Sequence, residues 1–400
     1  MSCIRLGVVG YGSRINGVVQ HPMAQALPAS IQPEIRVVGI VDPDEGSVRS
    51  LLSEADQKAA VFYPSLDEMV RGAKLDGLMI GTRCNLHAPF AVEAAQYDIP
   101  LYLEKPIAVS LDQALAVEAA FESSRCKVVV SFPLEVSPVY AMARNLVAQG
   151  AVGRPEHVHA VNYVPYGTCY WERGYRDYDV TQGLFLQKAT HDFSYIMGLI
   201  DAPMTRVAAL ANQGRVFGGD KPADLTCKDC GEQWTCLESP QNRVRNNSGG
   251  DPDDHLCVFS SAGGSPETGI NEDCSSAIFE FASGAHGVYS QVFFARRDAG
   301  SRGATVSGYH GTVSHDWFTG EVKQVRHHEP FSSVTKVGGG EEHFGGDHEL
   351  ARDFLGLIEG CLDPSRTPIE NGLRSVYACL AAKESALTGQ FIPIRQVGQS

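Results

Sequence analysis

Short apolar runs alternate with helix-type patterns over the first 130 residues. The β-rich runs that predict strands are Ile4–Val9, Ile35–Val41, Gly77–Ile80, Leu101–Leu103 and Val128–Phe132. Between the later runs, Ala88–Gln96 and Ser110–Ser123 have the periodicity of amphipathic helices, and Ser110 is suited to cap the second helix. Strands separated by helices of this length indicate βαβ units, so we predict an α/β fold with a doubly wound parallel sheet.

The pattern changes after about residue 137. It predicts helices at Val139–Gln149 and Gln182–Ile200, and then a hairpin from the runs Ser276–Ala282 and Gly287–Ala295 around a Ser-Gly turn. Strand-like runs at 303–327 and helices near 347–360 and 370–388 follow, with Asp347 in the first turn of a helix. We therefore expect one domain over 1–136 and a second, α+β domain with an antiparallel sheet over 137–400. Residues 213–273, rich in small polar residues and cysteine, form an irregular insertion in the second domain.

Composition narrows the class of protein. The length of 400 residues fits two domains. The net charge of −14, without a basic block, argues against nucleic-acid binding, and no apolar run is long enough to span a membrane. The 11 cysteines are mostly single within apolar stretches, which favours a reducing compartment. We expect a cytoplasmic protein.

A glycine-rich turn follows the first predicted strand. Gly10 and Gly12 permit a tight turn and close backbone approach, so the next helix would direct its N-terminus at a pyrophosphate. Ser13 and Arg14 are candidates for further phosphate contacts, although Ile15 occupies the place of the usual third glycine. An ordinary strand-to-helix turn is the alternative.

Asp42 ends the second predicted strand. A carboxylate there accepts hydrogen bonds from ribose hydroxyls and repels a 2′-phosphate, which favours NAD over NADP. Asp42 lies about 30 residues beyond Gly12, whereas the acidic residue usually follows the glycine motif by about 20 residues. The additional residues are explained by the proline-containing segment 20–33. An exposed loop aspartate is the alternative interpretation.

Two motifs then point to one family. The segment Thr82-Arg83-Cys84-Asn85-Leu86-His87 is followed by Ile99-Pro100-Leu101-Tyr102-Leu103-Glu104-Lys105-Pro106. Together they resemble the Gfo/Idh/MocA family, named for glucose–fructose oxidoreductase, inositol dehydrogenase and rhizopine catabolism. The resemblance implies a Rossmann domain followed by a domain with a large open, mainly antiparallel sheet, and assembly as a dimer or tetramer.

The same resemblance assigns roles to residues. It implies that Thr82, Asn85, His87 and Glu104 bind the cofactor, that Lys105 does so while pointing into the substrate pocket, and that Pro106 shapes the turn through a cis bond. The chemistry is sound in its own right, because a lysine cation at the end of a parallel strand can stabilise the alkoxide that forms as hydride leaves carbon. A surface Glu-Lys pair is the alternative.

The second domain carries Lys188-Ala189-Thr190-His191-Asp192 within the predicted helix 182–200. The three-residue spacing would place Lys188 and His191 on one helix face. The resemblance implies that His191 is the acid/base, whereas Gln187 stands where relatives often carry aspartate. Two neighbouring cationic groups would lower each other's pKa, leaving His191 neutral and able to accept a proton.

Aromatic and basic residues crowd the stretch before this segment. Aromatic faces pack on sugar C–H groups, while phenols and guanidinium groups bind hydroxyls or an anionic substituent. The candidate substrate-binding residues are Tyr163, Tyr166, Trp171, Arg173, Arg176, Lys188 and His191. A tyrosine-rich sheet edge or an oligomer contact explains the stretch about equally well.

Four cysteines lie in the insertion: Cys227, Cys230, Cys236 and Cys257. Thiolates at this spacing can converge on a structural zinc, with free thiols or a local disulfide as alternatives.

The preferred hypothesis is an NAD-dependent oxidoreductase that acts on a sugar, glycoside or cyclitol, with Lys105, His191 and Lys188 as catalytic residues. One alternative is an NAD-dependent glycosidase, which oxidises a ring hydroxyl transiently, eliminates the aglycone, adds water and reduces the ketone again. The other is a non-catalytic NAD-binding regulator.

Overall fold

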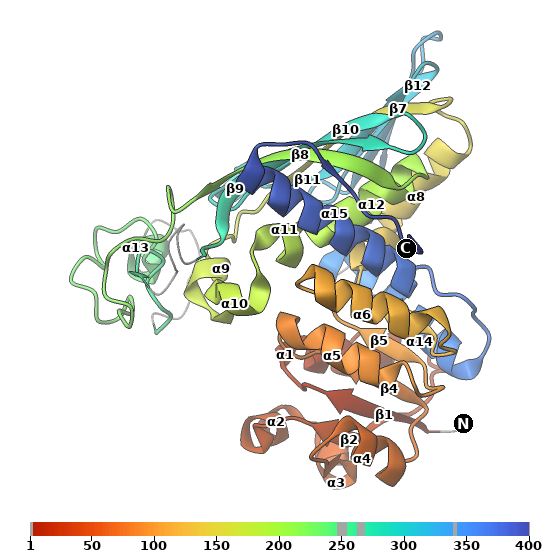
Figure 1. The fold of residues 1–400 in the computed structure, drawn as a ribbon, viewed down its shortest axis with the longest axis vertical. Helices are drawn as coiled ribbons and strands as arrows, with labels where there is room; N and C mark the ends of the chain where they lie inside the picture. Colours follow the sequence, from red (N-terminus) through yellow and green to blue (C-terminus); the bar gives the residue numbers. More distant parts are fainter. Residues whose placement is uncertain (1–2, 246–253, 262–268, 339–341, 400) are drawn as a thin grey trace.

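The computed structural model describes residues 3–245, 254–261, 269–338 and 342–399. They form two sheets with helices between and around them (Figure 1). The first sheet has six parallel strands in the order β3-β2-β1-β4-β5-β6. These strands are β1 (Ile4–Val9), β2 (Ile35–Val41), β3 (Val61–Phe62), β4 (Gly77–Ile80), β5 (Leu101–Leu103) and β6 (Val128–Val130). The order reverses between β1 and β4, and ligands of such sheets bind in the crevice at the carboxyl ends of these strands.

The predicted doubly wound sheet is thus confirmed, and most predicted strands have the observed bounds. The helices of this part are α1 (Ser13–Gln20), α2 (Glu45–Leu51), α3 (Glu54–Ala59), α4 (Leu66–Gly72), α5 (Cys84–Ala94), α6 (Leu111–Glu122) and α7 (Pro133–Val136). The Ser110 side chain caps α6 by accepting a hydrogen bond from the Gln113 amide, as expected. The helix predicted from residue 88 begins four residues earlier, at Cys84.

The second sheet has nine strands in the order β14-β13-β12-β11-β7-β10-β9-β8-β15. They are β7 (Pro155–Tyr163), β8 (Met204–Gln213), β9 (Glu272–Phe281), β10 (His286–Val292), β11 (Ser301–Gly308), β12 (Gly311–Asp316), β13 (Glu321–Arg326), β14 (Ser332–Lys336) and β15 (Ile392–Pro393). All pairs are antiparallel except β7 with β10. The predicted hairpin is β9–β10, and Gly284 in its turn has a φ of +87°, a conformation that favours glycine.

Helices cover one face of this sheet, and burial alternates along its strands accordingly. They are α8 (Pro138–Ala148), α12 (Ala189–Ile200) and α15 (Ile369–Thr388) (Figure 1). The opposite face exposes apolar side chains such as Leu210 and Ile278.

The continuous helix predicted over 182–200 is wrong. Short α11 (Leu184–Gln187) ends at Lys188, and α12 begins after it. Lys188 has φ −117° and ψ −50°, which interrupts the helix without glycine or proline. Lys188 therefore caps α12 and does not share a helix face with His191. The remaining short helices are α9 (Cys169–Glu172), α10 (Tyr178–Thr181) and α13 (Pro240–Arg245).

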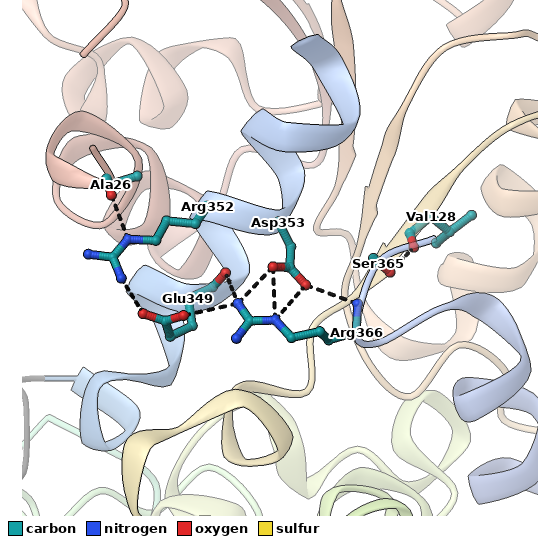
Figure 2. A network of polar contacts seen from close by, with 7 residues as sticks. All are labelled: Ala26, Val128, Glu349, Arg352, Asp353, Ser365 and Arg366. Carbon is teal, nitrogen blue, oxygen red and sulfur yellow. Dashed lines mark hydrogen bonds and ion pairs between the residues drawn. The ribbon is translucent and has the colours of Figure 1, made fainter. Parts of the chain in front are cut away.

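Helix α14 (Gly346–Glu359) returns from the second sheet to the first. Its apolar side, including Leu350 and Phe354, belongs to the same buried cluster as Leu6 of β1. Figure 2 shows the polar contacts that fix it: Arg352 Nε donates to the carbonyl of Ala26 at 2.7 Å, and Asp353 accepts from Arg366. The chain after the second sheet therefore completes the core of the first.

The insertion is irregular, as expected, over residues 214–245, 254–261 and 269–271, which hold α13 and isolated bridges. The rest of the insertion lies outside the described residues. Among the helices that are described, none has the length and apolar character required to span a membrane.

Candidate active site

The glycine-rich turn has the geometry that a phosphate-binding loop needs. Gly10 has a φ of +78°, and a Cβ there would lie 2.7 Å from the backbone nitrogen and Cα of Thr82. Gly12 precedes α1 without a side-chain cap, and a Cβ built on it meets nothing within 4 Å. Ser13 is exposed in the first turn. The helix N-terminus thus presents free backbone amides to an open space, which fits a pyrophosphate.

Asp42 lies beside this loop. One carboxylate oxygen accepts a hydrogen bond from the Tyr11 amide at 3.0 Å, and the other accepts from the Asp44 amide at 2.9 Å. These bonds fix the carboxylate, and each oxygen keeps a lone pair that can accept from a ribose hydroxyl.

Arg14 forms ion pairs with carboxylates from two other segments of the chain. Its guanidinium donates to Glu104 at 2.9 Å and to both oxygens of Asp347, at 2.7 and 2.8 Å. Although burial opposes it, Arg14 together with His343 holds the pKa of Asp347 well below its usual range. Asp347 lies in the first turn of α14, as predicted. Arg14 therefore joins the glycine-rich loop, the Glu-Lys-Pro segment and α14.

The Thr82–His87 segment forms the start of α5. The buried ring of His87 lies 2.7 Å from the carbonyl oxygen of Pro106 and 2.9 Å from that of Thr82, so it joins this segment to the Glu-Lys-Pro turn. The Asn85 side-chain oxygen is buried and has no partner among the described residues. An unpaired buried acceptor is costly, so Asn85 fits an absent donor such as a cofactor amide or hydroxyl.

Lys105 reaches from the first domain to the second. The Lys105–Pro106 peptide bond is cis, as expected. The Lys105 ammonium donates to the carbonyl oxygen of Gln187 at 2.7 Å. Burial, followed by the charge of Lys188, lowers the pKa of Lys105 to about 8.

His191 lies in the first turn of α12, with its ring edge-on to Phe132 at 5.8 Å between centroids. Burial first and Lys105 second lower the pKa of His191 well below its usual value, so the imidazole is neutral. Its Nδ1 and the Oε1 of Gln187 are buried without partners among the described residues. The structure thus brings Lys105, Gln187 and His191 together, with two orphaned polar atoms where a hydroxylated molecule can bind.

Asp192, the residue after His191, forms a buried ion pair with Arg302 that no motif in the sequence indicates. Asp192 accepts from Arg302 at 2.7 and 2.9 Å, and also from Tyr289 and Asn162, each at 2.8 Å. The sequence does carry one signal, since Arg302 occupies an inward-facing position of β11. A cation at such a position requires a buried partner.

The candidate substrate-binding residues lie in different environments, some exposed and some in the core. Tyr166 contacts Lys188 and is half exposed. Trp171 is fully buried against Phe217, which is a core position. Tyr163 lies at the end of β7 on the exposed side, and Arg173 is exposed. Arg176 is buried and donates to Ser260 in the insertion at 2.7 Å.

The predicted zinc site is not supported. No three His, Cys, Asp or Glu side chains within the described ranges are grouped so as to hold a metal ion, and none of the eleven cysteines forms a disulfide. The antiparallel bridge between Thr226 and Leu256 brings the stretches of Cys227 and Cys257 together. Burial raises the pKa of Cys227 to about 12, so its thiol is neutral.

Comparison with known proteins points to a family of oxidoreductases. Residues 4–132 match the model of the Gfo/Idh/MocA oxidoreductase family, NAD-binding Rossmann fold. The chain is 25% identical to a putative oxidoreductase, YteT, of Bacillus subtilis over 73% of this chain and 75% of that protein. It is 29% identical to an inositol 2-dehydrogenase of Rubrobacter xylanophilus, over 38% of this chain and 42% of that protein.

Solved structures share the whole fold. A levoglucosan dehydrogenase in complex with NADH superposes with a TM-score of 0.73 at 16% identity, covering 99% of this chain and 100% of that one. An oxidoreductase domain protein from Kribbella flavida gives a TM-score of 0.74 at 15% identity, with the same coverage. Residues 4–132 thus match the NAD-binding Rossmann domain of the Gfo/Idh/MocA oxidoreductase family, and the chain is an NAD(P)-dependent oxidoreductase.

Proposed function

We propose that this enzyme oxidises a ring hydroxyl of a sugar, glycoside or cyclitol with NAD. The observation that carries the proposal is the meeting of Lys105, Gln187 and His191 at the crevice beside the glycine-rich loop. The inositol and levoglucosan dehydrogenases among its relatives act on polyhydroxylated rings, as their names state. The fixed carboxylate of Asp42 favours NAD over NADP.

The residues of this chain divide the work as follows. Bound NAD⁺ would accept a hydride from the carbon that carries the hydroxyl. Neutral His191 takes the hydroxyl proton, and the Lys105 ammonium stabilises the developing alkoxide. Glu104, held by Arg14, and Asn85 bind the cofactor, with Gly10, Gly12, Ser13, Asp42, Thr82 and His87 forming the rest of its site. Gln187, which replaces a carboxylate, offers a neutral acceptor to a neighbouring hydroxyl.

A substrate screen tests the proposal. Sugars, glycosides and cyclitols are incubated with NAD and, separately, NADP, while NADH absorbance and product identity are followed. We expect net NADH formation with at least one polyhydroxylated ring, and its loss in Lys105→Met. If no ring compound is oxidised while the protein still binds NADH, the proposal is wrong.

A hydrolytic outcome is the second candidate, because Tyr166 and Lys188 add an acid/base pair beyond the one that oxidation needs. In that case glycosides would release their aglycone with no net NADH, and the same screen detects it.

We also propose assembly as a homo-oligomer through the helix-free face of the second sheet. That face exposes Leu210 and Ile278, which are 75% and 47% accessible in the single chain. Contiguous exposed apolar groups on a sheet face are typical of interfaces.

A further inference from the structure

A buried cation without an acidic partner lies at the candidate active site. Lys188 is only 7% exposed, and its ammonium donates to the phenol oxygen of Tyr166 at 3.1 Å. It also lies 5.3 Å and 5.8 Å from the ring centroids of Tyr166 and Tyr170. Within the described residues, no carboxylate forms an ion pair with it. Burying a charge is costly unless it is paired, so this arrangement requires compensation.

Lys105 adds a second positive charge to the candidate active site. Lys105 donates only to a backbone carbonyl, and its depressed pKa reflects the charge of Lys188 as well as burial. The two lysines therefore repel each other across the space where the substrate is proposed to bind. The carbonyl that accepts from Lys105 is uncharged, and the charge of Lys188 lowers the pKa of the Tyr166 phenol.

The carboxylates of the candidate active site are already engaged by arginines. Glu104 and Asp347 both accept from the guanidinium of Arg14. Asp192 is fully buried and matched by Arg302. Among the described residues, none of these carboxylates forms an ion pair with Lys188. Four cationic side chains (Arg14, Lys105, Lys188 and Arg302) face three carboxylates (Glu104, Asp192 and Asp347), so the site carries an excess of positive charge.

We propose that the substrate ring carries a carboxylate, as in a uronic acid, and that Lys188 binds it. This rests on the proposed function and names its substrate class. Tyr166 is 51% exposed as a residue, and its phenol oxygen is the hydrogen-bond partner of the Lys188 ammonium. A carboxylate there supplies the missing counter-charge and can also accept from the phenol. A single ammonium and a phenol suit a monoanion, whereas phosphate recognition usually recruits arginine or a helix N-terminus.

The test compares matched neutral and acidic rings. Turnover with NAD is measured for D-glucose against D-glucuronate, D-galactose against D-galacturonate, and glucose 6-phosphate. Calorimetry measures the binding of the same compounds to the enzyme with NADH, so that binding is scored even without turnover. We expect the uronate to exceed its neutral partner at least tenfold in kcat/KM or in affinity.

Variants of Lys188 test whether this residue causes the preference for the uronate. Lys188→Met keeps the length of the side chain, and we expect it to reduce the preference for the uronate by about 10- to 100-fold, the usual effect of losing a hydrogen bond to a charged group. Lys188→Arg restores part of the preference. Lys323→Met, which removes an exposed lysine from β13, is the matched control and leaves the preference unchanged. Thermal unfolding of each variant verifies the fold.

Three results would overturn the inference. They are equal use and binding of neutral and acidic rings, a stronger effect with glucose 6-phosphate than with either uronate, and an equal loss on both members of a pair in Lys188→Met. In each case oxidation of a neutral or phosphorylated ring would leave the proposed function intact. Conversely, uronate binding that depends on Lys188 without NADH formation would support the inference and refute the dehydrogenase.

Discussion

The buried ion pair between Asp192 and Arg302 provides a quantitative test of the structure. Asp192 is completely inaccessible and Arg302 nearly so, and the guanidinium donates two of the hydrogen bonds that the carboxylate receives. Arg302→Met removes the cation and keeps most of the side-chain volume. The carboxylate then retains only neutral donors, Asn162 and Tyr289.

The expected loss of folding free energy depends on whether Asp192 stays ionised without its partner or takes up a proton. Breaking a buried pair on one side usually costs about 3–5 kcal/mol. Uptake of a proton limits the cost, because an ordinary aspartic acid titrates near pH 3.9 and neutralising it at pH 7 requires about 4 kcal/mol. That limit falls by about 1.4 kcal/mol for each unit of decreasing pH, to about 1.5 kcal/mol at pH 5. The variant should therefore lose less stability at pH 5 than at pH 7.

Equilibrium urea unfolding of wild type and variant at pH 7 and pH 5 measures these differences. The control is Arg206→Met, which breaks the Arg206–Glu280 pair on the exposed face of the same sheet and should change stability little. A loss that is the same at both pH values, or no larger than that of the control, would refute the reasoning.

Four further outcomes are expected. Because Lys105 acts as a cation with a pKa of about 8, kcat/KM should fall above pH 8, and Lys105→Arg should move this decline to higher pH in a profile from pH 6 to 10. Asp42→Ala should raise the KM for NAD at least tenfold and improve use of NADP, measured by steady-state kinetics with both cofactors. Gly10→Ala should weaken NADH binding in fluorescence titration, because its Cβ would collide with the Thr82 backbone. Ile278→Asp should dissociate the proposed oligomer, as measured by light scattering, and an unchanged mass would exclude this face as the interface.

The first sheet could be predicted closely from the sequence. Parallel strands are covered on both faces, so β1, β2 and β4 appear as mainly apolar runs, interrupted only by Arg5 in β1 and Arg36 in β2. In the second sheet, β7 and β8 were missed. Their inward positions include small or polar side chains such as Ala160 and buried Asn162, which weaken the alternation.

Only the parts of the candidate site that belong to a local sequence motif could be predicted. The glycine-rich loop, Lys105 and His191 follow from local sequence, and the structure brings the two side chains to one place. The break at Lys188 had no glycine or proline to mark it. The partner of Arg14 is Asp347, 333 residues away, and no spacing rule can indicate such a pair.

The return of α14 to the first sheet has a consequence for how the chain acquires its structure during synthesis. The apolar surface around Leu6 needs Leu350 and Phe354, which the ribosome supplies only near the end of translation. Until then the core of the first domain lacks the side chains of α14, although all of the domain's strands have been synthesised. We therefore expect the two halves to mature together, and a fragment ending at residue 136 to be aggregation-prone rather than a usable NAD-binding module.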